Sequence, residues 1–230
     1  MGAVPARVLA RRIWSPPDVN GVRGYSGNRL WWVRQPKMDM TKADLRKQAR
    51  ATRRSFAQAR GTALFPTDCA SFAALHALLP PGQNIAGYVA MGHEADPAAL
   101  VQNMHSNGQF LCLPWIGEDG ETMTFRAWAP GDPLELADHG FSQPLASAPA
   151  STPDYVILPL LGFDRAGNRL GQGAGHYDRA LAQLPHALRI GLGWSVQECA
   201  SLPADPWDMP LDAILTEAEW IIPHNSRIKI

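Results

Sequence analysis

Three glycines at alternate positions, set between a buried strand and a helix, constrain this chain more than any other feature. Residues 155–160 form a strongly apolar run that predicts a buried strand, and the pattern of residues 176–184 predicts a helix. Between them lie Gly171, Gly173 and Gly175, which let the backbone adopt positive φ and approach a ligand closely. A buried strand that leads through a loop into a helix is the building unit of α/β folds.

Helices and strands alternate along most of the chain. The sequence Thr41-Lys42-Ala43-Asp44 has the form of a capping box, with Asp in place of the usual Glu or Gln, and opens a helix that runs to Arg60. Further helices are predicted over residues 68–79, capped by Thr67, and 96–107, with Asp96 as the cap and Pro97 at the first helical position. Strands are predicted over residues 85–91, 109–113, 122–128, 188–194 and 213–216, and residues 130–153 form a long irregular connection. This alternation predicts an α/β fold, a three-layer sandwich with a mostly parallel central sheet.

The first 37 residues differ from the remainder. They hold seven basic residues against one acidic residue, Asp18, so their net charge is about +6 and that of the remainder is about −6. An organellar transit peptide and a nucleic-acid-binding arm are alternatives, although no amphipathic helix is evident. We interpret residues 1–37 as an N-terminal extension that is disordered or absent from the mature protein, with translation starting at Met38 or Met40. Residues 38–230 are then the domain that carries the function.

Composition and charge exclude several classes of protein. The 21 basic and 21 acidic residues cancel overall, and the mildly acidic body lacks the basic stripe of a nucleic-acid-binding surface. No apolar run approaches the roughly 20 residues needed to cross a bilayer. Cys69, Cys112 and Cys199 lie far apart and form no CxxC pair, which argues against a zinc site and a disulfide framework. We therefore expect a cytoplasmic protein with neither a nucleic-acid partner nor a membrane partner.

The glycine loop and its flanks favour phosphate binding. Because the loop leaves the end of a strand and enters a helix, several backbone N–H groups and a helix N-terminus meet at one point that suits an anion. Arg169 adds a fixed cation, and Asp178 in the first helical turn is placed to hold Mg²⁺ against phosphate oxygens. The Walker pattern and the dinucleotide-binding fingerprint both require a different spacing. The alternative is a glycine-rich turn that binds no ligand.

The segment around this loop resembles the signature of the 5-formyltetrahydrofolate cyclo-ligase family. Residues 159–179 read Pro-Leu-Leu-Gly-Phe-Asp-Arg-Ala-Gly-Asn-Arg-Leu-Gly-Gln-Gly-Ala-Gly-His-Tyr-Asp-Arg. In the family, a strand ends in Pro-x-x-x-Phe-Asp and is followed by Gly-x-Arg-Leu-Gly-x-Gly-x-Gly-Tyr-Tyr-Asp. Other matches occur in the same order, at Lys42-x-x-x-Arg46, residues 88–96, 109–114 and 140–144, Gln197, Leu202-Pro203 and Asp208. The resemblance covers about residues 40–222.

The resemblance implies an ATP- and Mg²⁺-dependent ligase that converts 5-formyltetrahydrofolate to 5,10-methenyltetrahydrofolate and releases ADP and phosphate. The formyl oxygen attacks the γ-phosphate, N10 of the folate then closes on the activated carbon, and no covalent enzyme intermediate is expected. The residues implied for ATP are Lys42, Arg46, Arg169, Leu170, Gly171, Gln172, Gly173, Ala174, Gly175, His176 and Tyr177, of which Arg169 and Tyr177 are the catalytic residues. Those implied for the folate are Val89, Glu94, Gln172, Gly173, Ala174, Gly175 and His176, and those implied for Mg²⁺ are Asp178 and Asp208.

The resemblance also implies a fold similar to the sugar-phosphate isomerase/CoA-transferase type, in a protein that is a monomer or a weak oligomer. Residues 38–230 are then a cyclo-ligase catalytic domain. Three departures from the family pattern, Trp115, Gln143 and His176, leave a folate- or nucleotide-binding relative without turnover as an alternative. A sugar-phosphate isomerase or CoA-transferase type enzyme is the other alternative, and a requirement for Mg-ATP would exclude it.

Overall fold

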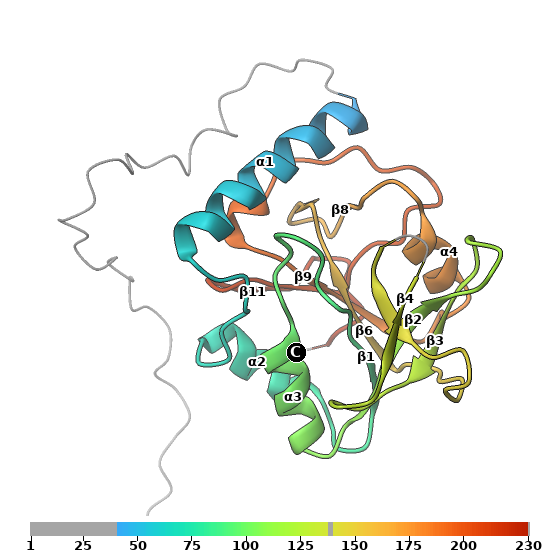
Figure 1. Ribbon diagram of the computed structural model, residues 1–230. Helices are drawn as coiled ribbons and strands as arrows, with labels where there is room; N and C mark the ends of the chain where they lie inside the picture. Colours follow the sequence, from blue (N-terminus) through green and yellow to red (C-terminus); the bar gives the residue numbers. More distant parts are fainter. Residues whose placement is uncertain (1–40, 138–139, 230) are drawn as a thin grey trace, which may run out of the picture. The chain divides into compact units, whose positions relative to one another are not determined.

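A seven-stranded sheet runs through the centre of the part of the chain that the computed structural model describes, residues 41–137 and 140–229 (Figure 1). The strand order is β11-β10-β9-β6-β1-β2-β3. The strands are β1 (Asn84–Ala86), β2 (Phe110–Ile116), β3 (Met123–Ala127), β6 (Tyr155–Pro159), β9 (Leu188–Leu192), β10 (Ala213–Leu215) and β11 (Trp220–Ile221). The five inner strands are mutually parallel, whereas β3 and β11 pair antiparallel at the two edges. The predicted α/β fold with a mostly parallel sheet is confirmed.

Helices cover both faces of this sheet. They are α1 (Lys42–Arg60), α2 (Ala70–Leu78), α3 (Ala98–Ser106) and α4 (His176–Ala182), with a short 3₁₀ helix, η2 (Ser195–Gln197). Successive residues of a strand point to opposite faces, so Ile157 packs with Phe72 of α2 and Leu100 of α3, while Leu158 packs with Leu181 of α4. The two faces therefore have separate hydrophobic cores, and the sheet is the middle of three layers.

The first helix is fixed at both ends and along its inner side. Thr41 and Asp44 form the expected capping box, and Gly61 ends the helix with a φ of 75°. Near its C-terminus, the ring of Phe56 lies 5.5 Å from that of Trp194, and the Arg60 guanidinium lies 5.1 Å from the centre of the same indole. Because Trp194 follows β9 directly, α1 is anchored beside the carboxyl end of a central strand, the edge where parallel α/β sheets bind ligands.

Several predicted boundaries were wrong. Cys69, not Thr67, is the N-cap of α2, and it makes no side-chain capping bond. The strand predicted over residues 85–91 ends at Ala86, because the following residues turn to line a cavity. The irregular connection predicted over residues 130–153 contains a hairpin of β4 (Leu134–Leu136) and β5 (Ser142–Pro144). A second hairpin that the sequence did not reveal joins β7 (Gly162–Phe163) to β8 (Arg169–Leu170), and the predicted N-terminal extension, residues 1–37, lies outside the described residues.

Candidate active site

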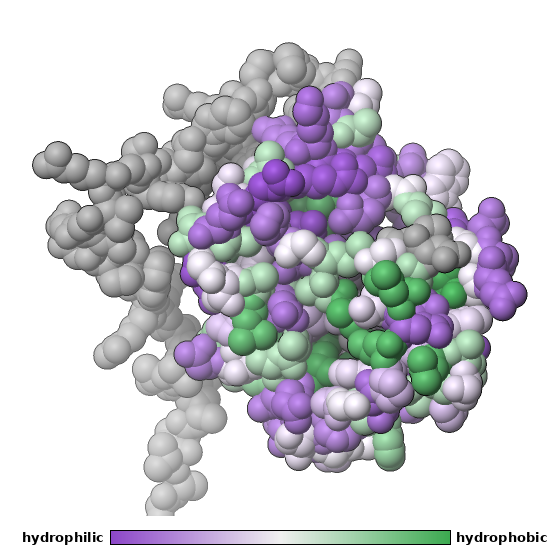
Figure 2. All heavy atoms as spheres, viewed as in Figure 1, coloured by the Kyte–Doolittle hydropathy of each residue, from purple (hydrophilic) through white to green (hydrophobic). Residues whose placement is uncertain are grey.

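A cavity of about 940 Å³ opens at the carboxyl ends of the parallel strands. Every residue that the sequence analysis proposed for ATP, folate or Mg²⁺ lines it. Its charged wall holds four basic and three acidic residues, Lys42, Arg46, Arg169, Arg179, Asp178, Asp205 and Asp208, and a fourth acidic residue, Glu94, also lines the cavity. Its apolar wall includes Val89, Met91, Pro114, Ile116, Met123, Phe141 and Leu160. Hydrophilic side chains gather over α1 in Figure 2, and apolar ones gather toward β2 and β4.

The inner side of α1 carries basic residues toward this cavity. Lys42, Arg46, Arg50 and Arg53 recur at spacings of four, four and three residues, which places them on one side of a helix. The Arg46 Nε donates to the Gly171 carbonyl over 3.0 Å, and the Arg50 Nη2 donates to the Gln172 Oε1 over 3.0 Å. The first helix therefore contacts the glycine loop directly.

The β7–β8 hairpin holds the glycine loop in place through Asp164. This buried carboxylate accepts hydrogen bonds from the backbone N–H groups of Ala166, Asn168 and Leu202. Leu202 lies in a loop after η2, so Asp164 ties the hairpin to the C-terminal part of the chain. The Phe-Asp of the sequence motif thus has a structural role, which is to orient the strand that leads into the loop.

Two of the three loop glycines have the positive φ expected from the sequence. Gly173 has a φ of 113°, and a β-carbon there would lie 3.3 Å from the Arg46 guanidinium carbon. Gly175 has a φ of 70°. The positive φ expected at Gly171 was wrong, because its φ lies outside the left-handed region. A β-carbon at Gly171 would instead crowd the Arg169 guanidinium at 3.2 Å, so the glycine there admits a close neighbour.

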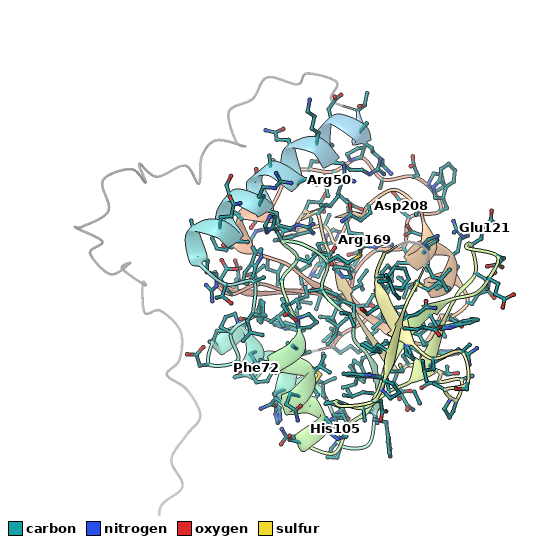
Figure 3. All side chains as sticks on the ribbon, viewed as in Figure 1. Arg50, Phe72, His105, Glu121, Arg169 and Asp208 are labelled. Atoms are coloured by element: carbon teal, nitrogen blue, oxygen red, sulfur yellow. The ribbon has the colours of Figure 1, made fainter. Side chains whose placement is uncertain are left out.

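Arg169 and Asp178 form an ion pair on the charged wall, with 2.6 Å between Nη2 and Oδ1. The Arg169 side chain is only 6% exposed, and its Nε has no hydrogen-bond partner among the described residues. The same Asp178 oxygen accepts from the Met209 N–H over 3.1 Å, which brings Asp178 close to the segment that carries Asp208. In Figure 3, Arg169 and Asp208 lie between α1 and α4. A buried guanidinium with an unsatisfied donor beside an open cavity is suited to bind an anion.

Lys42 joins α1 to the opposite side of the charged wall. Its Nζ lies 2.6 Å from the Asp205 carboxylate and 2.7 Å from that of Asp208. Burial disfavours the Lys42 ammonium, but the hydrogen bonds to both carboxylates outweigh this effect and raise the pKa of Lys42 above 10.5. Partial burial would likewise raise the pKa of Asp208, yet the Asp205 N–H and the Lys42 ammonium lower it below 3.8. Asp205, which the sequence analysis missed, therefore belongs to the same cluster.

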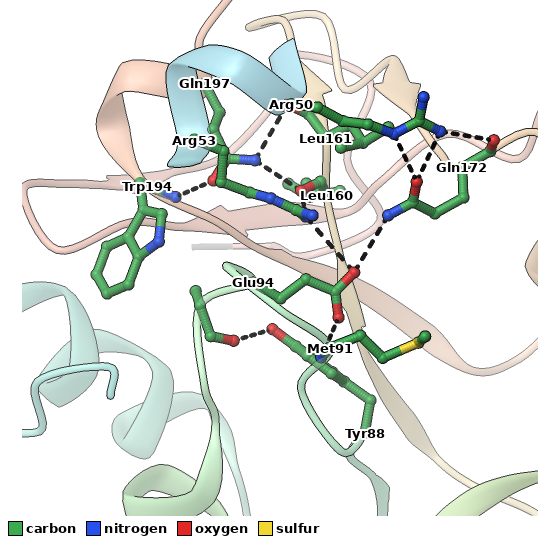
Figure 4. A network of polar contacts seen from close by, with 11 residues as sticks. Arg50, Arg53, Tyr88, Met91, Glu94, Leu160, Leu161, Gln172, Trp194 and Gln197 are labelled. Atoms are coloured by element: carbon green, nitrogen blue, oxygen red, sulfur yellow. Dashed lines mark hydrogen bonds and ion pairs between the residues drawn. The ribbon is translucent and has the colours of Figure 1, made fainter. Parts of the chain in front are cut away.

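Glu94 lies at the inner end of the cavity and is only 4% exposed (Figure 4). Its Oε2 accepts from the Met91 N–H over 3.0 Å. Its Oε1 accepts from Gln172 of the glycine loop over 3.4 Å and from Arg53 over 3.5 Å. The Tyr88 hydroxyl donates to the Ala95 carbonyl and closes the turn that carries Glu94. The carboxylate that we expect to bind the folate is thus connected to the loop that we expect to bind phosphate.

Tyr177 lies in the first turn of α4 and packs against the core on that face of the sheet. Burial raises the pKa of its phenol, and the nearby Glu94 carboxylate raises the pKa further. Tyr177 therefore remains a neutral phenol near neutral pH, which can donate a hydrogen bond but cannot act as a base. Helix α4 itself has seven residues and ends at Ala182, two residues before the predicted end.

The carboxylates of the cavity fit a metal ion that arrives with a phosphate ligand. The described residues contain no group of three or more His, Cys, Asp or Glu side chains that would enclose a metal ion. Asp178 and Asp208 nevertheless line one cavity and are connected through Met209. Mg²⁺ is commonly bound through one or two carboxylates, with phosphate oxygens and water as the remaining ligands. This donor set suits Mg²⁺ shared with a nucleotide better than a resident metal ion.

Two of the three departures from the family pattern lie outside the cavity. Gln143 is buried, accepts from the Ile116 N–H over 3.0 Å and donates to Glu135 over 3.1 Å, so it joins β2 to the β4–β5 hairpin. The Trp115 ring stacks under the Arg126 guanidinium at 4.0 Å. Only His176 lines the cavity.

The described residues also contain no helix with the length and apolar character of a membrane span.

Comparisons with known proteins identify the family of this chain. A sequence model of the 5-formyltetrahydrofolate cyclo-ligase family matches residues 38–217. The 5-formyltetrahydrofolate cyclo-ligase of Haemophilus influenzae is 31% identical over 140 residues, which cover 58% of this chain and 75% of that protein. The solved 5,10-methenyltetrahydrofolate synthetase of Mycoplasma pneumoniae aligns with a TM-score of 0.55 at 25% identity, over 77% of this chain and 99% of its own. The corresponding Aquifex aeolicus structure, at 22% identity, shares the fold with a TM-score of 0.58 over 83% of this chain and 97% of its own. The resemblance inferred from the sequence is confirmed, and the chain is an enzyme that belongs to the 5-formyltetrahydrofolate cyclo-ligase family.

Proposed function

We propose that the enzyme converts 5-formyltetrahydrofolate to 5,10-methenyltetrahydrofolate, with ATP and Mg²⁺, and releases ADP and phosphate. The observation that carries the proposal is that one cavity is lined by a set of charged side chains and by a set of apolar side chains. A triphosphate needs cations, and a flat pterin ring needs apolar contacts with a few polar groups. Family membership supports 5-formyltetrahydrofolate as one substrate. The resemblance described above implies ATP as the other.

At the charged wall, Lys42, Arg46 and Arg169 bind the triphosphate, and the backbone of residues 171–175 lies against it. The 2.6 Å pair between Arg169 and Asp178 and the two ion pairs of Lys42 leave these cations partly neutralised in the ligand-free protein. Four carboxylates balance the four basic side chains of the cavity, so the protein alone offers a polyanion little net positive charge. This balance favours Mg-ATP over free ATP as the bound species.

Asp178 and Asp208 are the residues that hold Mg²⁺. When bound, the ion offsets negative charge on the phosphate oxygens during phosphoryl transfer. Release of Asp178 from Arg169 would make Arg169 available to the phosphates. Release of Asp208 would leave Lys42 with one ion pair, to Asp205, and with donors for a phosphate oxygen. The chain thereby exchanges one set of ion pairs for another, so no charge is left unpaired in the cavity.

At the apolar wall, Val89, Met91 and Ile116 contact the faces of the pterin, and Glu94 accepts hydrogen bonds from its N–H groups. The side chains of Gln172 and His176 and the backbone of the glycine loop contact the folate from the nucleotide side. The Tyr177 phenol, which stays protonated, lies next to the loop and donates a hydrogen bond near the reacting centre.

The reaction needs no nucleophile from the protein. The formyl oxygen forms a bond to the γ-phosphorus and the bond to the β-phosphate oxygen breaks, which releases ADP. N10 then attacks the formyl carbon, which closes the ring. The proton of N10 is lost, the bond between the carbon and the former formyl oxygen breaks, and that oxygen leaves as part of the phosphate. The task of the protein is to align the two substrates and to stabilise the charge that moves between them.

The test follows the near-ultraviolet absorbance of methenyltetrahydrofolate after full-length protein, 5-formyltetrahydrofolate and Mg-ATP are mixed. Wild type is compared with Asp178→Asn, with an exposed matched control, Asp68→Asn, and with reactions that lack ATP or contain EDTA. We expect a rise in absorbance that requires both ATP and Mg²⁺, is lost in Asp178→Asn and is unchanged in Asp68→Asn.

Two other results would contradict parts of this proposal. If no product forms but folate or ATP raises the melting temperature, the protein is a binding relative without turnover. If product forms equally well with EDTA present, the proposed role of Mg²⁺ is wrong.

A further inference from the structure

Arg53 is a buried cation behind the cavity wall. Its side chain is 8% exposed, and it is not among the residues that line the cavity. Arg54, its neighbour on α1, is exposed, as is usual for arginine on a helix in a folded protein. Burial lowers the pKa of the Arg53 guanidinium, and Glu94 opposes that change. The guanidinium nevertheless remains charged. Burial of a charge destabilises the folded state, so a buried charge is seldom present without a function.

The contacts of Arg53 link the two strand ends that form the inner end of the cavity. Its Nη1 donates to the Leu160 carbonyl over 3.2 Å and to Glu94 Oε1 over 3.5 Å (Figure 4). Leu160 follows β6, and Glu94 lies in the turn after β1. The same Leu160 carbonyl accepts from Gln197 over 2.6 Å, so Arg53 is attached to a rigid part of the structure. Arg53 Nε has no hydrogen-bond partner among the described residues.

Glu94 is left with acceptor capacity that faces the cavity. A carboxylate offers about four lone-pair sites. Among the described residues, Glu94 accepts from one backbone donor over 3.0 Å and from two side-chain donors over 3.4 Å and 3.5 Å. Only Arg53, of these donors, is a buried cation, and it is the group that stabilises the charge of a carboxylate with 4% exposure.

We propose that Arg53 is a positioning residue for the folate: it keeps the Glu94 side chain oriented toward the cavity, without contacting the substrate. This inference rests on the proposed function, because it takes the ligand of Glu94 to be the pterin. Its consequence is specific to one substrate. Loss of Arg53 weakens folate binding and leaves ATP binding, which depends on Lys42, Arg46 and Arg169, nearly unchanged.

The experiment compares Arg53→Met and Arg53→Lys with the exposed matched control Arg54→Met. The KM for 5-formyltetrahydrofolate and the KM for ATP are measured separately, well below the melting temperature of each variant. We expect Arg53→Met to raise the folate KM about tenfold or more and the ATP KM less than about twofold. Arg53→Lys should restore only part of the loss, because a single ammonium cannot hold Leu160 and Glu94 with the geometry of a guanidinium.

A purely structural role predicts another pattern. Arg53→Met would then reduce stability and kcat, through loss of folded enzyme, while both KM values stay at the wild-type level. That pattern would overturn the proposal, as would an equal change in both KM values. If Arg53→Met does not fold, an unchanged folate KM in Arg53→Lys overturns it in the same way.

Binding measured without turnover tests whether Arg53 acts through Glu94. The dissociation constant for 5-formyltetrahydrofolate is determined by calorimetry for wild type, Arg53→Lys, Glu94→Gln and the double variant. We expect Arg53→Lys to weaken binding severalfold in the wild-type background and to have no further effect beside Glu94→Gln. Additive effects would contradict the proposal. Absence of wild-type turnover and of folate binding would overturn the proposed function itself, whereas normal wild-type turnover with an unaffected folate KM would overturn the role of Arg53 alone.

Discussion

The Lys42 ammonium on the first helix lies 2.7 Å from the carboxylate of Asp208, which is 166 residues further along the chain. Asp205 accepts from the same ammonium over 2.6 Å. These ion pairs join the start of α1 to the loop that follows η2, and both partners line the cavity. The resemblance implies Lys42 for ATP and Asp208 for Mg²⁺. In the ligand-free protein, two groups that we expect to bind different ligands therefore form an ion pair with each other.

Replacement of Lys42 should therefore affect nucleotide binding far more than folding. We expect Lys42→Met to raise the KM for ATP roughly 10- to 100-fold, because a hydrogen bond to a charged group contributes about 1.5–3 kcal/mol. The effect on the free energy of unfolding should be small, because the ion pairs are partly exposed to solvent. Lys47→Met, on the exposed side of the same helix, is the matched control. A wild-type KM for ATP in Lys42→Met would contradict a role at the phosphates.

A substitution that adds a β-carbon at Gly173 should distort the glycine loop while the rest of the protein stays folded. The φ of 113° is unfavourable for any other residue, and the new methyl group would lie 3.3 Å from the Arg46 guanidinium carbon. We expect Gly173→Ala to raise the KM for ATP about tenfold, since a strained backbone costs about 1–3 kcal/mol. The melting temperature should change little, because residue 173 is exposed and the loop can move to relieve this strain without disturbing the core.

Gly117→Ala is the comparison for this variant, because Gly117 has an ordinary φ and a β-carbon there would meet its nearest neighbour at 3.5 Å. It should retain the kinetic constants of the wild type. Equal losses in both glycine variants would indicate a general effect of substitution at surface loops and would count against a special geometry at Gly173.

The sequence predicted the parts of this site that depend on local spacing. The glycine loop and the capping box of Thr41 could be recognised because their residues are close together along the chain. The pair Lys42 and Arg46 was identified only through the family resemblance, because two basic residues four apart are common on helices. Asp205 could not, since it reaches Lys42 only after the chain has folded, across 163 residues. Arg53 was missed for another reason. It lies in a helix rich in arginine, and only the packing of α1 against Leu160 and Glu94 shows that this arginine is buried.

Strand lengths and hairpins depended even more on tertiary contacts. The apolar run after Ile85 predicted a strand of seven residues, yet β1 has three, because Tyr88 and Glu94 turn away to form the end of the cavity. The β4–β5 hairpin lies in a segment rich in proline, which ordinarily argues against strands. Its position is set by buried Gln143, whose side chain bonds β2. No local pattern in the sequence indicates such a contact.

The three cysteines should differ strongly in reactivity. Burial raises the pKa of the Cys112 thiol to about 12 and that of Cys199 to about 11, so almost none of either is thiolate at pH 8. Cys69 is only partly buried. We expect iodoacetamide at pH 8 to modify Cys69 first in the native protein, and all three cysteines at similar rates in urea. Peptide mass spectrometry of labelled protein measures this order. Labelling of native Cys112 as fast as Cys69 would show that the strand around it opens readily.

Asp212 and Arg227 should make the stability of the fold dependent on pH in the acid range. Asp212 is 3% exposed, and Arg227 donates to its Oδ1 over 2.7 Å. Burial alone would raise the pKa of Asp212, but the hydrogen bonds from Arg227 and from the Arg189 N–H outweigh burial and lower it below 3.8. A carboxyl group whose pKa is lower in the folded state stabilises that state above its unfolded pKa, and the stabilisation is lost as the pH falls through the folded pKa.

The variant Asp212→Asn should therefore reduce the free energy of unfolding at pH 7 by about 2 kcal/mol, since Arg227 loses its charged partner but stays partly exposed and keeps two carbonyl acceptors. The difference from wild type should shrink as the pH falls below about 4, because the Asp212 carboxyl group then binds a proton in the unfolded chain more readily than in the folded protein. Urea unfolding at pH 7 and at several values between 3 and 5 measures both quantities. Asp132→Asn, in an exposed turn, is the control for general effects of acid. A difference that stays constant down to pH 3 would mean that the Asp212 carboxylate contributes through packing, and that its charge contributes little.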